Sequence, residues 1–383
     1  MKRIYFDFAA TTFVRDEVLK EMSPYFQENF GNPSSLHFFG QEALKAIDFS
    51  REKIKNILNA EFLREIIFTS SATESNNLAL KGLAFYYYFF KKIKPHFITS
   101  SIEHPSVLEV LADLEEMGII EVNYLKPEKN SLVDPEKIKR EIKENTFLIS
   151  LHYVNSELGT IQPIKEISKV LSEINKERKG KIYFHVDAAQ AGFENLNVQD
   201  LGIDLMTLSS HKIYGPKGIA LLYIRQGTPI VRLVSGSEQE YNLRAGTEAV
   251  PLIVGFAKAM ELAFQERERV NNHFKEMRDY FIERIQDFQG KIMLNTLPEL
   301  SSPKILNLYF KTKSSQELLI YLDNYGVAIS AGTACKSRAN EPSYIVSDIY
   351  GKERSKNSLR FSFGLSTKKE DIDYVIDLLK KFL

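Results

Sequence analysis

The chain of 383 residues contains one cysteine, Cys335, and no tryptophan. A single thiol excludes an intrachain disulfide and the paired-cysteine motifs that bind zinc. We therefore expect a protein of a reducing compartment, the cytoplasm, and no metal site. Neither sign of charge is in excess, because 50 Lys and Arg residues balance 50 Asp and Glu residues. This balance gives no reason to expect a nucleic acid, a membrane surface or an acidic partner.

Long apolar stretches are also missing. The N-terminus reaches Asp7 after only a few apolar residues, too soon for the hydrophobic part of a secretory signal. The longest apolar run, residues 78–90, is interrupted by Lys81 and is shorter than the roughly 20 helical residues that span a bilayer. We therefore expect no membrane segment. With 44% hydrophobic residues, the chain can instead bury a large core, and it is long enough for about two domains.

The region from residue 64 to residue 224 alternates short apolar runs with amphipathic segments. This rhythm is typical of a doubly wound α/β domain with a mostly parallel sheet. The expected strands are residues 66–69, 97–100, 120–125, 147–151, 182–186, 205–208 and 219–224.

The pattern changes after residue 250. Residues 251–288 are rich in charge and contain no turn signal before Gln289 and Gly290, which predicts one long helix between two domains. Beyond it, the expected strands are residues 305–310, 327–330 and 359–363, and the expected helices are 315–325 and 368–382. That mixture indicates a smaller α+β domain. We expect a large domain over residues 13–255 and a small domain over residues 1–12 and 256–383, which carries the cysteine loop.

Polar clusters follow five of the expected strands, at residues 70–74, 103–104, 152–157, 187–190 and 209–212. In open parallel sheets, ligands bind beyond the carboxyl ends of the strands. The clusters are therefore expected to converge on one pocket.

The cluster from Ser71 to Glu74 allows two interpretations. Its S-x-x-E pattern is that of a capping box, which begins a helix by satisfying free backbone N–H groups. The same N–H groups and the helix dipole also form a binding site for phosphate.

The role of Asp187 is equally open, because a carboxylate at the end of an apolar strand needs a cationic or hydrogen-bonding partner. That partner could be a protonated pyridine nitrogen, a helix N-terminus or a buried cation.

Lys212 stands in a short segment between two strands, flanked by hydroxyls and followed by a Gly/Pro turn. A lysine is ordinarily a solvated surface residue, but it also forms Schiff bases with carbonyl substrates and with pyridoxal phosphate. It follows Asp187 by 25 residues, across one helix and one strand. That interval suits an amine and a carboxylate that hold opposite sides of one cofactor.

Further candidates also have structural alternatives. His104 could stack on a flat cofactor or be a satisfied structural histidine. Asn155 and Glu157 could orient a substrate or form a turn. Cys335 has small neighbours on one side and two cations on the other, which suits a reactive thiolate, although a lone cysteine is often an inert buried one.

Eight motifs, in this order, resemble one family. They are residues 7–12, 30–35, 68–77, 103–107, 185–190, 209–218 and 243–247, and the pair Ala334-Cys335. On these residues the chain resembles, nearly end to end, the cysteine desulfurases of the NifS and IscS type. This group lies within the class V aminotransferases, which have fold type I of the pyridoxal-phosphate enzymes. The resemblance implies pyridoxal 5'-phosphate as cofactor and L-cysteine as substrate.

The resemblance also implies a role for individual residues. Lys212 would bind the cofactor as a Schiff base and later move a proton between the substrate α-carbon and the cofactor. Asp187 would pair with the pyridinium nitrogen, Gln190 would bond the phenolic oxygen, and His104 would stack on the ring and act in catalysis. The implied phosphate ligands are Thr73, Ser209 and His211, with Thr247 from a second subunit, so a homodimer is implied. Ala72 is a further implied cofactor-binding residue.

On the substrate side, the resemblance implies that Asn155, which would also contact the cofactor, and Arg360 hold the carboxylate of L-cysteine, where a bidentate guanidinium fits well. Cys335 would then attack the substrate sulfur, so that the enzyme carries a persulfide and alanine is released. The loop that follows Cys335 resembles the long loop of desulfurases that deliver the persulfide to an iron–sulfur scaffold or a sulfur-carrier protein.

Two alternatives stay open: a selenocysteine lyase that uses the same residues, and a non-catalytic scaffold for sulfur transfer. The intact set of Lys212, Asp187 and Cys335 favours an enzyme over the scaffold. The chain departs from the family pattern at Ser156, Ser237, Glu238, Ala249 and Tyr344. None of these changes removes a group with a chemical role.

Overall fold

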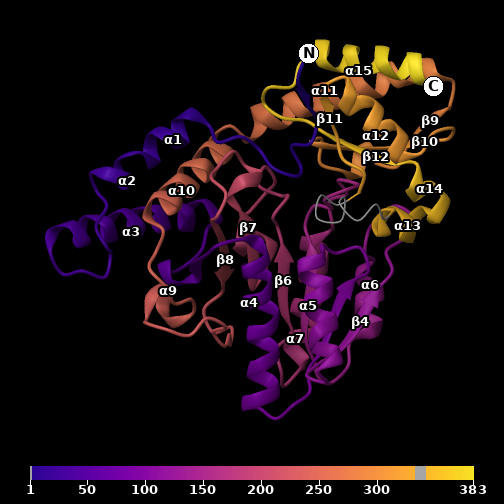
Figure 1. Ribbon diagram of the computed structural model, residues 1–383. Coiled ribbons are helices and arrows are strands. Elements are labelled where there is room, and N and C mark those ends of the chain that lie inside the picture. The colour runs from indigo at the N-terminus through magenta and orange to yellow at the C-terminus, as the bar shows by residue number, and fades with distance from the viewer. Residues whose placement is uncertain (1, 333–341) are drawn as a thin grey trace.

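The computed structural model describes residues 2–332 and 342–383, so Cys335 lies outside the described residues. The chain forms a seven-stranded sheet and a three-stranded sheet, with helices around both (Figure 1). Strands β1 (Ile4–Tyr5) and β11 (Val327–Ala328) form a separate parallel pair. The pair ties the start of the chain to its last third. Both termini lie beside the smaller sheet, at the top of Figure 1.

The large sheet has the strand order β2-β8-β7-β6-β5-β3-β4. Its strands are β2 (Ile66–Thr69), β3 (His96–Ser100), β4 (Glu121–Leu125), β5 (Thr146–His152), β6 (Tyr183–Asp187), β7 (Leu205–Ser209) and β8 (Ala220–Ile224). All neighbours are parallel except the two that β8 makes, with β2 and β7. Apart from the edge strand β4, each of these strands is buried along its whole length. Their nearly continuous apolar sequences are those of strands covered by helices on both faces.

Helices cover both faces of this sheet. One face packs on α4 (Ala72–Phe85) and α5 (Pro105–Glu116), which lie in front of the strands in Figure 1. The other face packs on α7 (Ile164–Glu177) and α10 (Val250–Gln265). The remaining helices of this part are α1 (Asp16–Met22), α2 (Pro24–Gln27), α3 (Phe38–Leu58), α6 (Pro135–Glu141), α8 (Val198–Leu201) and α9 (Gln239–Asn242). The expected fold class, a doubly wound and mostly parallel α/β sheet with a smaller α+β part, is confirmed.

The smaller sheet is antiparallel, with the order β12-β10-β9. Its elements are β9 (Ile292–Leu294), β10 (Ile305–Phe310), β12 (Ser358–Ser362), α11 (Arg267–Ile285), α12 (Ser315–Asn324), α13 (Tyr344–Tyr350), α14 (Lys352–Lys356) and α15 (Lys369–Phe382). One apolar cluster continues from the large sheet into this part through Phe6, Phe274 and Phe361. The two sheets therefore share a core, and the division at residues 12 and 255 stays a prediction.

The prediction of a single long helix over residues 251–288 is wrong. The structure has two helices, α10 and α11, which meet at Glu266 with φ −100° and ψ 6°. The Glu266 carboxylate accepts a 2.8 Å hydrogen bond from Arg15, far away in the sequence, so a tertiary contact supports the break. The other expected elements lie within two residues of their expected bounds. Among the residues that the structure describes, no helix is both long and apolar enough to cross a membrane.

Candidate active site

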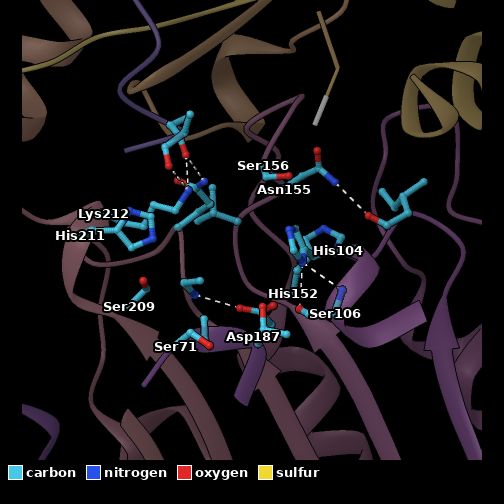
Figure 2. Close-up of a pocket in the computed structure, with 18 of the residues that line it drawn as sticks. Ser71, His104, Ser106, His152, Asn155, Ser156, Asp187, Ser209, His211 and Lys212 are labelled. Carbon is cyan, nitrogen blue, oxygen red and sulfur yellow. Dashed lines mark hydrogen bonds between the residues drawn. The ribbon is translucent and has the colours of Figure 1, made fainter. Parts of the chain in front are cut away.

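The polar clusters meet at one cavity of about 210 Å³, beyond the carboxyl ends of the large sheet's strands (Figure 2). Ten of the site residues expected from the sequence line it: Ala72, Thr73, His104, Asn155, Asp187, Gln190, Ser209, His211, Lys212 and Arg360. Thr247 does not, because it is exposed in the loop before α10. The remaining candidate, Cys335, lies outside the described residues.

Lys212 ends a short 3-10 turn, Ser210–Lys212, that directly follows β7. Its amine donates hydrogen bonds to the backbone carbonyls of Ala9 and Ala10, the second at 2.9 Å. The N-terminal segment therefore holds this amine at the cavity. Lys212 is not the solvated surface lysine that was the alternative interpretation of the sequence. The carbonyl oxygen of Lys212 accepts a further hydrogen bond, at 2.9 Å, from Nζ of Lys304.

Asp187 ends β6 with 7% of its surface exposed and lies at the bottom of the cavity in Figure 2. Its carboxylate accepts hydrogen bonds from Nδ2 of Asn76 at 2.9 Å and from the amide of Ala189 at 3.0 Å. Within residues 2–332 and 342–383, no cationic side chain lies within ion-pair distance of it. A buried carboxylate with neutral donors alone is suited to a cationic ligand.

His104 is the N-cap of α5, and its Nδ1 accepts a 3.1 Å hydrogen bond from the amide of Ser106. The ring proton is therefore assigned to Nε2. Burial lowers the pKa of His104; the Asp187 carboxylate opposes this shift and the Lys212 amine adds to it. The ring is thus neutral and presents a flat surface to the cavity, so the structural role and the stacking role are compatible.

The start of α4 forms another part of the cavity wall. Oγ of Ser71 accepts a 3.1 Å hydrogen bond from the amide of Glu74, so Ser71 caps the helix. The expected capping box is wrong in its second hydrogen bond, in which the Glu74 carboxylate would accept from the amide of Ser71. The Glu74 carboxylate accepts instead from the amide of Ser70 and from Nε of Arg244, because the arginine offers it a charged partner. The first-turn N–H groups of this helix remain suited to an anion.

Ser209 and His211 lie on the same side of the cavity as Lys212 in Figure 2. Burial lowers the pKa of His211 to about 3, and the nearby amines of Lys212, Lys217 and Lys304 add to this. A neutral imidazole can donate a hydrogen bond to an anion without bringing a charge of its own.

Asn155 lies in a turn that follows β5, as one of the two interpretations of the sequence predicted. Its Oδ1 accepts hydrogen bonds from the amides of Glu157 at 3.0 Å and Leu158 at 2.9 Å. Gly159 completes the turn with a positive φ of 76°, which glycine adopts without strain. The side chain also lines the cavity, so the turn does not remove it from the site.

Arg360 comes from β12 of the smaller sheet and has 1% of its surface exposed. Nη1 donates to the carbonyl of Ser156 and Nη2 donates to Oδ1 of Asp7, both at 2.7 Å. Nε has no partner among the described residues. The guanidinium is therefore fixed in place at the cavity wall.

Lys304 was not among the candidates expected from the sequence. It stands in the turn before β10 with 3% of its surface exposed and contacts the backbone of Lys212. A single lysine ahead of an apolar strand carries no sequence signal of burial, because only the packing of the smaller sheet places it behind Lys212.

The cavity fits pyridoxal phosphate by the chemistry of its donors. It combines a lysine amine, a buried carboxylate whose partners among the described residues are neutral, a neutral aromatic ring and a helix N-terminus. Oε1 of Gln190 is buried without a partner among the described residues, while Nε2 donates to the carbonyl of Ala9 at 2.7 Å. The side-chain oxygen of Gln190 can therefore accept a hydrogen bond from a bound molecule. In the described part of the chain, no group of three or more metal-ligating side chains comes together.

Comparisons with known proteins agree with this chemistry. The family model described as aminotransferase class-V matches residues 4–375. The cysteine desulfurase IscS of Dictyoglomus turgidum is 44% identical over the whole of this chain and 95% of its own length. A solved NifS-like protein has a TM-score of 0.91 at 34% identity, with both chains fully covered. The structure described as SspA in complex with cysteine has a TM-score of 0.82 at 37% identity, covering 94% of this chain and 98% of its own.

Proposed function

Because the chain belongs to the class-V aminotransferase family, and within it to the cysteine desulfurases, we propose that its cavity is the active site of such an enzyme. The protein is a pyridoxal-phosphate-dependent enzyme that takes the sulfur from L-cysteine and releases L-alanine. The observation that carries the assignment of the site is one cavity that holds the amine of Lys212, the carboxylate of Asp187 and the ring of His104.

Bound pyridoxal phosphate supplies an electron sink for the α-carbon of the amino acid. Asp187 would hold the ring nitrogen and favour its protonated form, since a nearby carboxylate stabilises a cation. The Lys212 amine would be the nucleophile that holds the cofactor, and it would take and return the proton at the substrate α-carbon. His104 would stack on the ring. Thr73, Ser209 and His211, with Ala72 beside them, would hold the phosphate at the start of α4 and the end of β7.

Arg360 and Asn155 hold the carboxylate of L-cysteine, and the fixed guanidinium sets its orientation. The Cys335 thiolate attacks the substrate sulfur. A sulfur–sulfur bond forms, the carbon–sulfur bond breaks, and its electron pair stays on the carbon, which is protonated to give alanine. The enzyme is left with a persulfide on Cys335.

The proposal extends to the assembly. The exposed position of Thr247, away from the cavity of its own chain, supports a homodimer in which this residue completes the phosphate site of the partner. The persulfide is then passed, in the cytoplasm, to an iron–sulfur scaffold or a sulfur-carrier protein. We retain residues 13–255 as the large domain and residues 1–12 with 256–383 as the small one.

The test is to incubate the purified protein with L-cysteine, measure alanine and persulfide, and record the absorption spectrum of the bound cofactor. We expect alanine and persulfide in equal amounts. C335A should keep the spectrum and lose the persulfide, whereas K212A should lose both. A wild-type protein that binds no pyridoxal phosphate, or a C335A variant with unchanged persulfide formation, would contradict the proposal. Turnover of L-selenocysteine but not L-cysteine would instead identify a selenocysteine lyase.

A further inference from the structure

Lys304 is a buried amine directly behind the lysine of the site. Its Nζ donates a 2.9 Å hydrogen bond to the carbonyl oxygen of Lys212, and 3% of its surface is exposed. Its own carbonyl accepts a 2.9 Å hydrogen bond from the amide of Phe363, next to β12. Lys304 therefore connects the smaller sheet to the turn that carries Lys212.

This amine lacks the partner that buried ammonium groups normally have. No carboxylate within residues 2–332 and 342–383 lies within ion-pair distance of Nζ, and its recorded acceptor is a neutral carbonyl. The charged groups that face it are Lys212 from the 3-10 turn and Arg360 from β12, which is itself paired with Asp7; His211 of the same turn is titratable but neutral. Burial, followed by the charges of Lys212 and Arg360, lowers the pKa of Lys304 to about 7.

We propose that Lys304 is a positioning residue for Lys212: its hydrogen bond fixes the turn, and its charge opposes protonation of the Lys212 amine. Among the described residues, two neighbouring groups act on Lys212 in opposite directions. The carbonyls of Ala9 and Ala10 accept hydrogen bonds from its amine and favour the ammonium form, whereas Lys304 disfavours that form. Protonation of either amine disfavours protonation of the other, so the charge of Lys304 acts on Lys212 as long as Lys304 is protonated. A neutral Lys212 amine is the form that can attack the cofactor aldehyde.

The significance for catalysis rests on the proposed function, but the test does not use turnover. The rate at which an amine-reactive acylating reagent labels Lys212 is measured against pH in the full-length protein after removal of the cofactor, with mass spectrometry of the Lys212 peptide. The midpoint of that curve is the pH at which half of the Lys212 amine is neutral. A second readout is the pH at which the absorption band of the bound cofactor changes in the loaded protein.

K304M removes the charge, so we expect labelling of Lys212 to become roughly tenfold slower below pH 7, where Lys304 of the wild type is protonated, and to approach the wild-type rate in alkali. K304R keeps a donor and is charged at every working pH, so its midpoint should fall below that of the wild type. The matched control is K217M, which removes an exposed lysine near the same turn and should leave the curve unchanged. The band of the bound cofactor should shift in the same directions.

An unchanged rate of Lys212 labelling below pH 7 in folded K304M would overturn the proposal. So would equal upward shifts in K304M and K304R, because these would reflect a structural disturbance without a charge effect. Failure of the proposed function is a separate outcome: the wild type would then form no alanine from L-cysteine, whatever the labelling curves show.

Discussion

Replacing Lys304 by methionine should raise the free energy of unfolding at acidic and neutral pH and lose this effect in alkali. Burial lowers the pKa of Lys304 from its ordinary 10.5 to about 7 in the folded protein. Below the lower value, both the folded and the unfolded chain bind the proton, and the folded state carries the full cost of burying it. Between the two values the unfolded chain binds more protons, so the stability of the wild type rises with pH until the cost is gone.

The size of the effect follows from the two pKa values. A fall from 10.5 to about 7 corresponds to about 5 kcal/mol, at roughly 1.4 kcal/mol per unit. Part of the shift comes from the charges of Lys212 and Arg360, and relaxation of the folded protein around a buried charge lowers its cost further. We therefore expect K304M to gain about 2–3 kcal/mol over the wild type near pH 6 and nothing from this source near pH 10.5. Methionine has a similar length and no charge, so it can occupy the same apolar space.

The assay is urea unfolding of wild type and K304M at several pH values between about 6 and 10. Groups that titrate equally in both proteins cancel in the difference between their free energies of unfolding. K217M again serves as the control, because its lysine is exposed and its difference from the wild type should not depend on pH. A K304M difference that stays constant with pH, or that grows toward alkali, would refute the reasoning.

Two further substitutions test other parts of the structure. E240Q breaks the pair in which Arg51 and Glu240, with side chains 5% and 2% exposed, lie 2.9 Å apart; we expect a loss of about 3 kcal/mol in urea unfolding because a buried guanidinium is left unpaired, whereas D287N, in an exposed pair, should cause no measurable change. S71A removes the cap of α4 and should cost about 1 kcal/mol of stability and weaken pyridoxal-phosphate binding in an equilibrium titration; a stability loss with unchanged cofactor affinity would show that the cap has no part in the phosphate site.

The strands of the large sheet could be predicted because burial on both faces requires continuous apolar runs, which end where polar residues begin. For the same reason the strand from Ile66 to Thr69 has the bounds expected from the sequence. The break at Glu266 could not be predicted, because no glycine or proline marks it and the amphipathic pattern continues on both sides. Its support comes from Arg15, and a contact across 251 residues leaves no local signal.

Prediction of the site was limited in the same way. The position of Asp187 at the end of a strand was readable, because the carboxyl ends of parallel strands share one edge of the sheet. Its neutral partners, which are Asn76 and the amide of Ala189 in the described part of the chain, and the two carbonyls that hold Lys212 could be seen only in three dimensions. Cys335 stays a prediction, since its loop lies outside the described residues, as does the role of Thr247 in a second subunit.

The charges around Lys212 come from both sheets, and this division has a consequence for the chemistry. Lys212 belongs to the turn after β7, whereas Lys304 and Arg360 come from the turn before β10 and from β12. A displacement of the smaller sheet would therefore change the charge behind Lys212 and the position of the proposed carboxylate anchor, Arg360, at the same time. Since Lys304 holds the carbonyl of Lys212 through a single hydrogen bond, K304M separates the two effects: it removes the charge and leaves Arg360 in its pair with Asp7.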